Sequence, residues 1–148
     1  MHNDSTTSKL NILNSVNIND IDDYLSEHIS DITIGDYFSQ CINHNIIKPA
    51  DIVRKCQGYI SKSYIYALIN GEKSNPSRDV VILICLAGNM NLKQTRRTLE
   101  LFHHRPLYPK DSRDAIIAIC INNETFDIDV VNDYLFEHGL ETLGQMKS

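Results

Sequence analysis

Apolar side chains recur every three or four positions along most of the chain after residue 18, which is the spacing of one face of an α-helix. No segment shows the two-residue alternation of a half-buried strand. The segment 80–88 is apolar on all sides and rich in β-branched residues, so a buried strand is the alternative there, and its helical surroundings favour a buried helix. The pattern predicts an all-α protein with helices at 19–32, 34–46, 49–56, 62–70, 80–88, 92–102, 115–121 and 128–138.

Residues at the predicted helix ends support this division. Side chains that can accept a hydrogen bond from the first helical turn precede the helices: Asn19, Thr33, Ser61, Ser77, Asn91, Asp111 and Asp127. Two starts also have the spacing of a reciprocal capping box: Thr33 with Asp36, and Asn91 with Gln94. Pro49 fits the first position of a helix, and Gly71 and Gly139 fit the left-handed residue that follows a helix end.

The 148 residues are enough for one domain with a helical extension. Residues 1–18 are rich in Asn, Ser and Thr, with scattered aliphatic positions, so we expect a polar N-terminal arm there. We expect residues 19–102 to form the main helical domain with its preceding helix. Residues 103–148 are expected to form a C-terminal extension of two helices.

Four cysteines lie far apart, each within an apolar pattern: Cys41, Cys56, Cys85 and Cys120. They form no C-x-x-C pair and have no histidine at a zinc-like offset, so buried free thiols are favoured over a disulfide framework. Such thiols are typical of a reducing compartment, and the expected location is the cytoplasm. The longest apolar run, 80–87, is too short to cross a bilayer, and we expect no membrane partner.

The formal net charge of −5 argues against a nucleic-acid partner until its distribution is considered. Residues 1–46 carry one Lys or Arg against seven Asp or Glu, residues 47–113 carry twelve against five, and residues 114–148 carry one against seven. The centre therefore has a charge of +7, and each end has −6. A basic centre between acidic ends fits a DNA-facing surface, although accidental clustering of solvated charges fits this feature equally well.

A helix, a tight turn, a second helix, a glycine stop and a proline-ended loop occur at compact spacing in residues 48–76. The segments IKPADIVRKC, SKSYIYALING and EKSNPS resemble the helix-turn-helix of lambda-repressor/Cro-type (XRE-like) regulators. The resemblance covers about residues 33–102 and implies a lambda-repressor-like five-helix domain that acts as a sequence-specific, double-stranded-DNA-binding transcriptional regulator. The segments LYPKDSRDAIIAICINN and VNDYLFEHGL resemble the helical extension of some Gram-positive regulators of this class, which implies a bacterial protein.

In this family the second helix of the motif lies in the major groove, where its outward side chains meet base edges. The resemblance implies five candidate base-contacting residues: Lys62, Ser63, Tyr64, Tyr66 and Ala67. Lys62 can donate to guanine O6 and N7, and Ser63 can pair with either base type. It also implies four candidate phosphate-contacting residues: Lys48, Lys73, Ser74 and Asn75.

One recognition helix reads only a few base pairs, so the resemblance also implies a homodimer on two half-sites. The apolar stripes at 21–32 and 115–135 are both candidate dimer interfaces. The acidic helices of the extension suit subunit pairing, a protein partner or a cover for the core equally well.

The remaining motifs indicate neither catalysis nor a cofactor. A solvated loop is favoured over a metal or phosphate contact at His103, His104 and Arg105, and no phosphate-cradling glycine motif or G-x-S-x-G is present. We therefore expect no enzyme activity, no metal and no cofactor. The alternative function is a helical protein-interaction adaptor whose helix-turn-helix scaffold does not bind DNA. The acidic ends favour it, as does Ala67 in place of a polar base-reading residue.

Overall fold

The structure is a computed structural model that describes residues 17–21 and 32–144. The chain divides into two units, Met1–Ile32 and Thr33–Ser148. The first contains the 3-10 helix η1 (Ile18–Asp20), whose N-cap Asn17 accepts a hydrogen bond from the N–H of Asn19 at 3.0 Å. The predicted cap at Asn19 is therefore wrong, because the carboxamide of Asn17 starts the turn two residues earlier. The arm up to residue 16 and most of the predicted helix at 19–32 lie outside the described residues.

The second unit is helical throughout its described part, residues 33–144, which contains no strand. The all-α prediction is thereby confirmed for these residues. The helices are α3 (Ile34–Asn43), α4 (Pro49–Lys55), α5 (Lys62–Ile69), α6 (Arg78–Ala87), α7 (Leu92–Leu101), α8 (Ser112–Asn122) and α9 (Ile128–Glu137).

Short-range hydrogen bonds set where these helices begin. The predicted N-cap side chains accept a bond from the first turn at six helices: Thr33, Ser61, Ser77, Asn91, Asp111 and Asp127. The capping box at Asn91 is complete, because the side chain of Gln94 also accepts the N–H of Asn91 at 3.0 Å. Helix α8 begins at Ser112 and not at the predicted 115. Its first three residues are polar, so the apolar pattern begins only at Ala115. Helix α3 ends before the predicted 46, because the chain turns at Asn45, with φ +59°.

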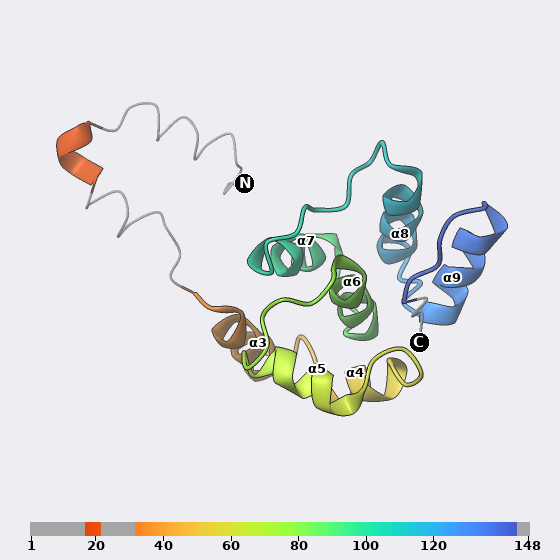
Figure 1. Ribbon diagram of the computed structural model, residues 1–148, viewed down its shortest axis with the longest axis horizontal. Helices are drawn as coiled ribbons and strands as arrows, with labels where there is room; N and C mark the ends of the chain where they lie inside the picture. The colour runs from red at the N-terminus through yellow and green to blue at the C-terminus, as the bar shows by residue number, and fades with distance from the viewer. Residues whose placement is uncertain (1–16, 22–31, 145–148) are drawn as a thin grey trace. The chain divides into compact units, whose positions relative to one another are not determined.

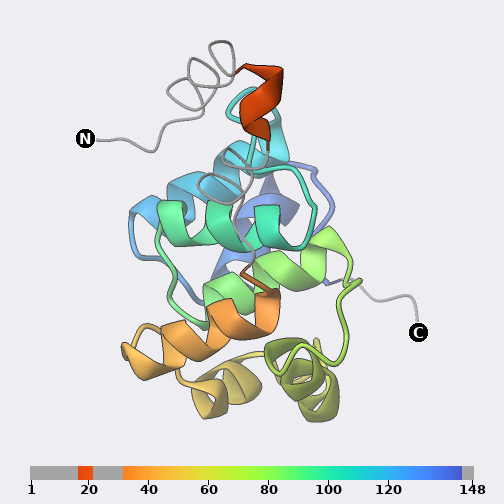
Figure 2. The ribbon, with the colours of Figure 1, turned by 90° about the vertical axis from the view of Figure 1, so that its left-hand side faces the viewer.

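Helix α6 lies at the centre of the second unit, with α4, α7 and α9 packed against it (Figure 1). Residues 81–87 are at most 1% exposed. A segment surrounded in this way needs apolar residues on every side, which explains why its sequence could also suit a buried strand. Figure 2 shows α4 and α5 at one end of the unit and α8 toward the other.

Two crossed ion pairs join the start of α6 to the start of α8. Arg78 donates two hydrogen bonds to Asp114, at 2.9 and 2.8 Å, and Arg113 donates two to Asp79 at the same distances. Burial by itself would raise the pKa of Asp114. Hydrogen bonds from Arg78 and from the N–H of Tyr108, with nearby arginine charges, outweigh burial and lower the pKa. The extension is therefore tied to the core by paired charges as well as by apolar contacts.

All four cysteines are free and buried, as predicted. Burial raises the pKa of the thiols, to about 12 for Cys56 and Cys85, so these side chains pack as neutral groups. In the described ranges, no helix combines the length and the apolar character that a membrane span requires.

Candidate nucleic-acid interface

The turn between α4 and α5 is built from local backbone contacts. The carbonyl of Cys56 accepts hydrogen bonds from the N–H groups of Tyr59 at 2.8 Å and Ile60 at 3.0 Å. Gly58 has φ +89°, in the left-handed region that glycine adopts without strain. The side chain of Ile60 is 8% exposed and belongs to the core. The turn is thus anchored by one apolar side chain at its end.

Helix α5 buries one face and exposes its beginning. Ile65 and Leu68 are fully buried, and Ile69 is nearly so, which fixes the helix against α3 and α4. Ser61 Oγ accepts the N–H of Tyr64 at 3.2 Å and so satisfies a donor of the first turn. The core therefore fixes which side of α5 is turned outward.

The five predicted base-contacting residues differ in how open they are. Lys62 and Ser63 are exposed, whereas Tyr64, Tyr66 and Ala67 are partly buried. The ring of Tyr64 packs against the core. The first turn of α5 thus presents Lys62 and Ser63 most fully, and the other three contribute only part of their surface.

All four predicted phosphate-contacting residues are exposed: Lys48, Lys73, Ser74 and Asn75. Lys48 is the N-cap of α4, and the other three lie in the loop after α5. That loop is held at both ends. The carbonyl of Ala67 accepts the N–H groups of Glu72 at 2.8 Å and Lys73 at 3.1 Å, and the carbonyl of buried Pro76 accepts a bond from His104 Nε2 at 2.8 Å. These residues all flank α4 or α5, which lie along one edge of the unit (Figure 1).

A close backbone contact fixes the end of α5 against the start of α3. A Cβ atom added at Gly71 would lie 3.4 Å from Gly35 Cα, and one added at Gly35 would lie 3.3 Å from the carbonyl oxygen of Asn70. Gly71 also has φ +82°, as predicted for the residue that stops this helix. The position of α5 therefore depends directly on the start of α3.

Several arginines of the basic segment 47–113 form ion pairs with carboxylates of the same chain. Arg78 and Arg113 are held in the crossed pairs, and Arg54 binds Asp51 at 3.0 Å, which lowers the pKa of that carboxyl. The charge of +7 therefore overstates what α4 and α5 present outward. Five exposed lysines of this segment form no ion pair with any residue that the structure describes, and three of them flank or begin the two helices: Lys48, Lys62 and Lys73.

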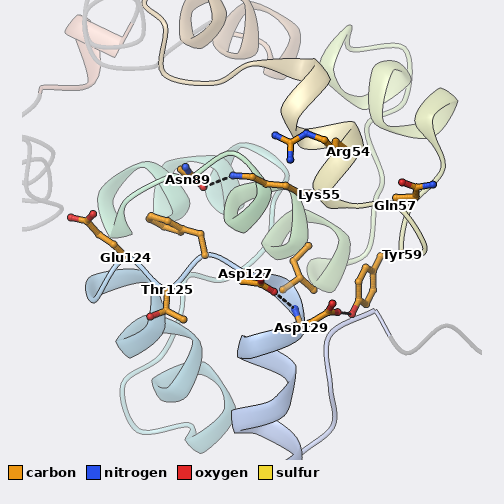
Figure 3. Close-up of a pocket in the computed structure, with 11 residues that line it drawn as sticks. Arg54, Lys55, Gln57, Tyr59, Asn89, Glu124, Thr125, Asp127 and Asp129 are labelled. Atoms are coloured by element: carbon orange, nitrogen blue, oxygen red, sulfur yellow. Dashed lines mark hydrogen bonds between the residues drawn. The ribbon is translucent and has the colours of Figure 1, made fainter.

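A polar groove of about 750 Å³ opens beside the α4–α5 turn (Figure 3). Two bases from the end of α4 and three acids from the extension line it: Arg54, Lys55, Glu124, Asp127 and Asp129. Lys55 donates to Asn89 at 3.0 Å, and the hydroxyl of Tyr59 donates to Asp129. Burial, together with this acceptor, raises the pKa of Tyr59. The bases that end α4 thus share a groove with acidic residues.

Sequence reasoning missed two long-range features of this unit. The expected solvated loop at 103–105 is wrong at His104, which is partly buried and binds the loop after α5. The crossed pairs of Arg78 and Arg113 were also missed. Each joins residues more than thirty positions apart, and no local motif marks such a pair. Across residues 17–21 and 32–144, no cluster of side chains suited to a metal ion is present.

No protein-family model, curated protein or solved structure matches this chain. The resemblance carried by residues 48–76 therefore remains a prediction.

Proposed function

We propose that the protein is a sequence-specific, double-stranded-DNA-binding transcriptional regulator with a lambda-repressor-like helix-turn-helix formed by α4 and α5. The observation that carries this proposal is the outward side of α5. Its apolar residues are buried, while Lys62 and Ser63 are exposed at its first turn. No acidic residue occurs from Ser61 to Gly71. A polar helix start of this kind suits insertion into the major groove.

Candidate phosphate-binding donors precede and follow the α4–α5 pair. Lys48 precedes α4, and Lys73, Ser74 and Asn75 follow α5, so the helix pair has exposed donors at its beginning and at its end. Such donors position a protein on phosphates without reading sequence. In this proposal the five base-contacting and four phosphate-contacting residues keep the roles that the resemblance implies. The protein acts in the bacterial cytoplasm and catalyses no reaction.

The second candidate is a protein-interaction adaptor with the same scaffold but no DNA binding. The observation that favours it is the internal use of Arg78 and Arg113, which leaves fewer bases outward than the sequence count indicates. The partly buried, nonpolar Ala67 on α5 also favours it.

Homodimerisation is part of the DNA-binding proposal, since two half-sites about one helical turn apart need two recognition helices. Of the two candidate stripes, 21–32 lies mostly outside the described residues. Light scattering of the chain, free and with its DNA, tests the dimer, and a monomer in both states would contradict it.

The deciding experiment is enrichment of random duplex DNA on the immobilised full chain, followed by sequencing and by titration of the preferred site in rising salt. We expect one preferred sequence whose affinity falls with salt at a log–log slope of about −0.9 per neutralised phosphate. Failure to enrich any sequence, or an affinity that does not change with salt, would favour the adaptor.

A further inference from the structure

Exposed apolar side chains gather on the C-terminal helices. Of nine large apolar side chains exposed among the described residues, four lie on α8 and α9: Ile119, Val130, Tyr134 and Phe136. Ile119 is 61% exposed and Tyr134 46% exposed, although Ile117 and Leu135 nearby on the same helices are fully buried. Each of the two helices therefore exposes apolar side chains that the core does not bury. A cluster of exposed apolar side chains is typical of an interaction surface.

Ile119 and Tyr134 line one groove of about 310 Å³ between α8 and α9, called the α8–α9 groove below. Its other main lining residues are Ile116, Cys120, Asn123 and His138. The amide of Asn123 donates to the carbonyl of Ile119 at 2.8 Å, and His138 Nδ1 donates to the carbonyl of Tyr134 at 2.7 Å. With these donors used within their own helices, the groove offers mainly apolar surface.

The segment that carries this groove is acidic. Residues 114–144 contain seven acids and no Lys or Arg. Of these acids, Asp114 is neutralised by Arg78. Asp133 and Glu137 are exposed four positions apart on α9, and Glu137 lies three positions after Tyr134, so the two carboxylates form a row beside this side chain. The apolar groove is therefore flanked by carboxylates.

We propose that the α8–α9 groove binds a basic amphipathic helix of another protein. Apolar anchors of that helix pack against Ile119 and Tyr134, and its Lys or Arg residues meet Asp133 and Glu137. A second copy of the same acidic face would bring like charges together, which argues against the 115–135 stripe as the homodimer interface, and a DNA backbone would be repelled. The proposal does not rest on DNA binding by α5.

The test titrates the full chain into a fluorescent peptide of about 16 residues with leucines on one helical face and lysines beside them. A second peptide carries glutamates in place of the lysines. We expect the lysine peptide to bind, with an affinity that falls as salt rises, and the glutamate peptide to bind far more weakly. Equal binding of the two peptides, or no binding of the lysine peptide, overturns the proposal.

Two single variants locate the binding site. Ile119→Ser removes an exposed groove side chain and should weaken peptide binding about tenfold, while thermal melting stays the same. Phe136→Ala is the control, because Phe136 is 75% exposed on α9 but does not line the groove. Equal losses in both variants would show non-specific adhesion and overturn the proposal.

A double variant and a self-association measurement complete the test. Asp133→Asn combined with Glu137→Gln should reduce the salt dependence of peptide binding, and unchanged salt dependence would contradict the charge argument. Self-association of the free chain that Ile119→Ser abolishes in sedimentation velocity would identify a second copy as the occupant and overturn the proposal. Retention of duplex DNA by Ile119→Ser reports on α5 separately, so failure of either proposal is distinguishable from failure of the other.

Discussion

The α4–α5 edge and the α8–α9 pair are built from the same kind of short, capped helix, yet they present opposite surfaces. Helix α5 buries its apolar residues, and no acid occurs from Ser61 to Gly71. Helices α8 and α9 leave Ile119 and Tyr134 exposed among carboxylates. Helices α4 and α9 both pack against α6. The core therefore sets the position of each helix, and the side chains that remain outside the core determine which kind of partner each region can bind.

The acidic extension is also joined to the rest of the unit by ion pairs. One crossed pair has its base on α6 (Arg78) and the other has its base on α8 (Arg113), so both arginines contribute to stability and are withdrawn from any outer surface. Variants of these pairs and of the exposed lysines therefore separate what holds the unit together from what faces a partner.

The largest expected effect is on folding. Asp114→Ala removes a carboxylate that is 1% exposed from a bidentate pair and leaves the guanidinium of Arg78 with only its two carbonyl acceptors. We expect the free energy of unfolding to fall by about 3 kcal/mol, measured by urea denaturation. The matched control is Asp79→Ala, which breaks the other pair, where the carboxylate is 29% exposed. Its loss should be about 1 kcal/mol. Equal losses would show that burial does not distinguish the two pairs.

The next effect is on DNA recognition. Lys62→Ala and Ser63→Ala should each weaken binding to the preferred site by roughly 1 to 3 kcal/mol, while binding to unrelated DNA changes little, because base contacts carry the specificity. Melting should stay the same, since both side chains are exposed. Lys110→Ala, at an exposed lysine in the loop before α8, is the control. Unchanged binding by both α5 variants would remove the recognition-helix assignment and favour the adaptor.

A smaller effect is expected in acid. The pKa of Asp114 is lowered in the folded chain, so its contribution to stability is complete above the ordinary aspartate value of about 3.9 and is lost as the pH falls through the folded value. The melting temperature should therefore fall more steeply below about pH 4 in the parent chain than in Asp114→Asn. Parallel curves for the two proteins would contradict the assignment of this acid dependence to Asp114.

The smallest effect is expected at a phosphate contact. Lys48→Ala should weaken all DNA sequences about equally and reduce the salt slope by about one unit, because a phosphate contact carries no sequence information. Titrations of the preferred site and of unrelated DNA at several salt concentrations measure both quantities. A loss of affinity confined to the preferred site would show that Lys48 contacts a base and not a phosphate.

The sequence alone predicted the helix starts and ends that are fixed by hydrogen bonds or backbone angles of nearby residues. The caps at Ser61, Ser77 and Asn91 each act on residues about three positions away, so their spacing predicts them. The same applies to Gly71, which ends α5 at positive φ. At the first unit, Asn17 and Asn19 are chemically equivalent caps two positions apart, so composition could not choose between them.

Long-range contacts could not be predicted in this way. Arg78 and Asp114 are 36 positions apart, and His104 binds the carbonyl of Pro76 across 28 positions. A count of charges by segment assigned Arg78 and Arg113 to an outer basic surface, because the sequence does not show which carboxylates fold back onto them. Helical spacing predicted that Lys62 and Ser63 lie outside the buried face formed by Ile65 and Leu68, whereas their role as base contacts comes from the resemblance and stays a prediction.

The contact between Gly35 and Gly71 brings the backbone at the start of α3 directly against the backbone at the end of α5. Thr33 caps α3 only two residues before Gly35, and the chain from the first unit enters at that point. Because the backbones meet with no side chain between them, a methyl group added at Gly35 would lie against the carbonyl oxygen of Asn70, at the end of α5. The short distance between these two helix ends therefore depends on the absence of a side chain, and alanine at Gly35 would have to move one helix end away from the other.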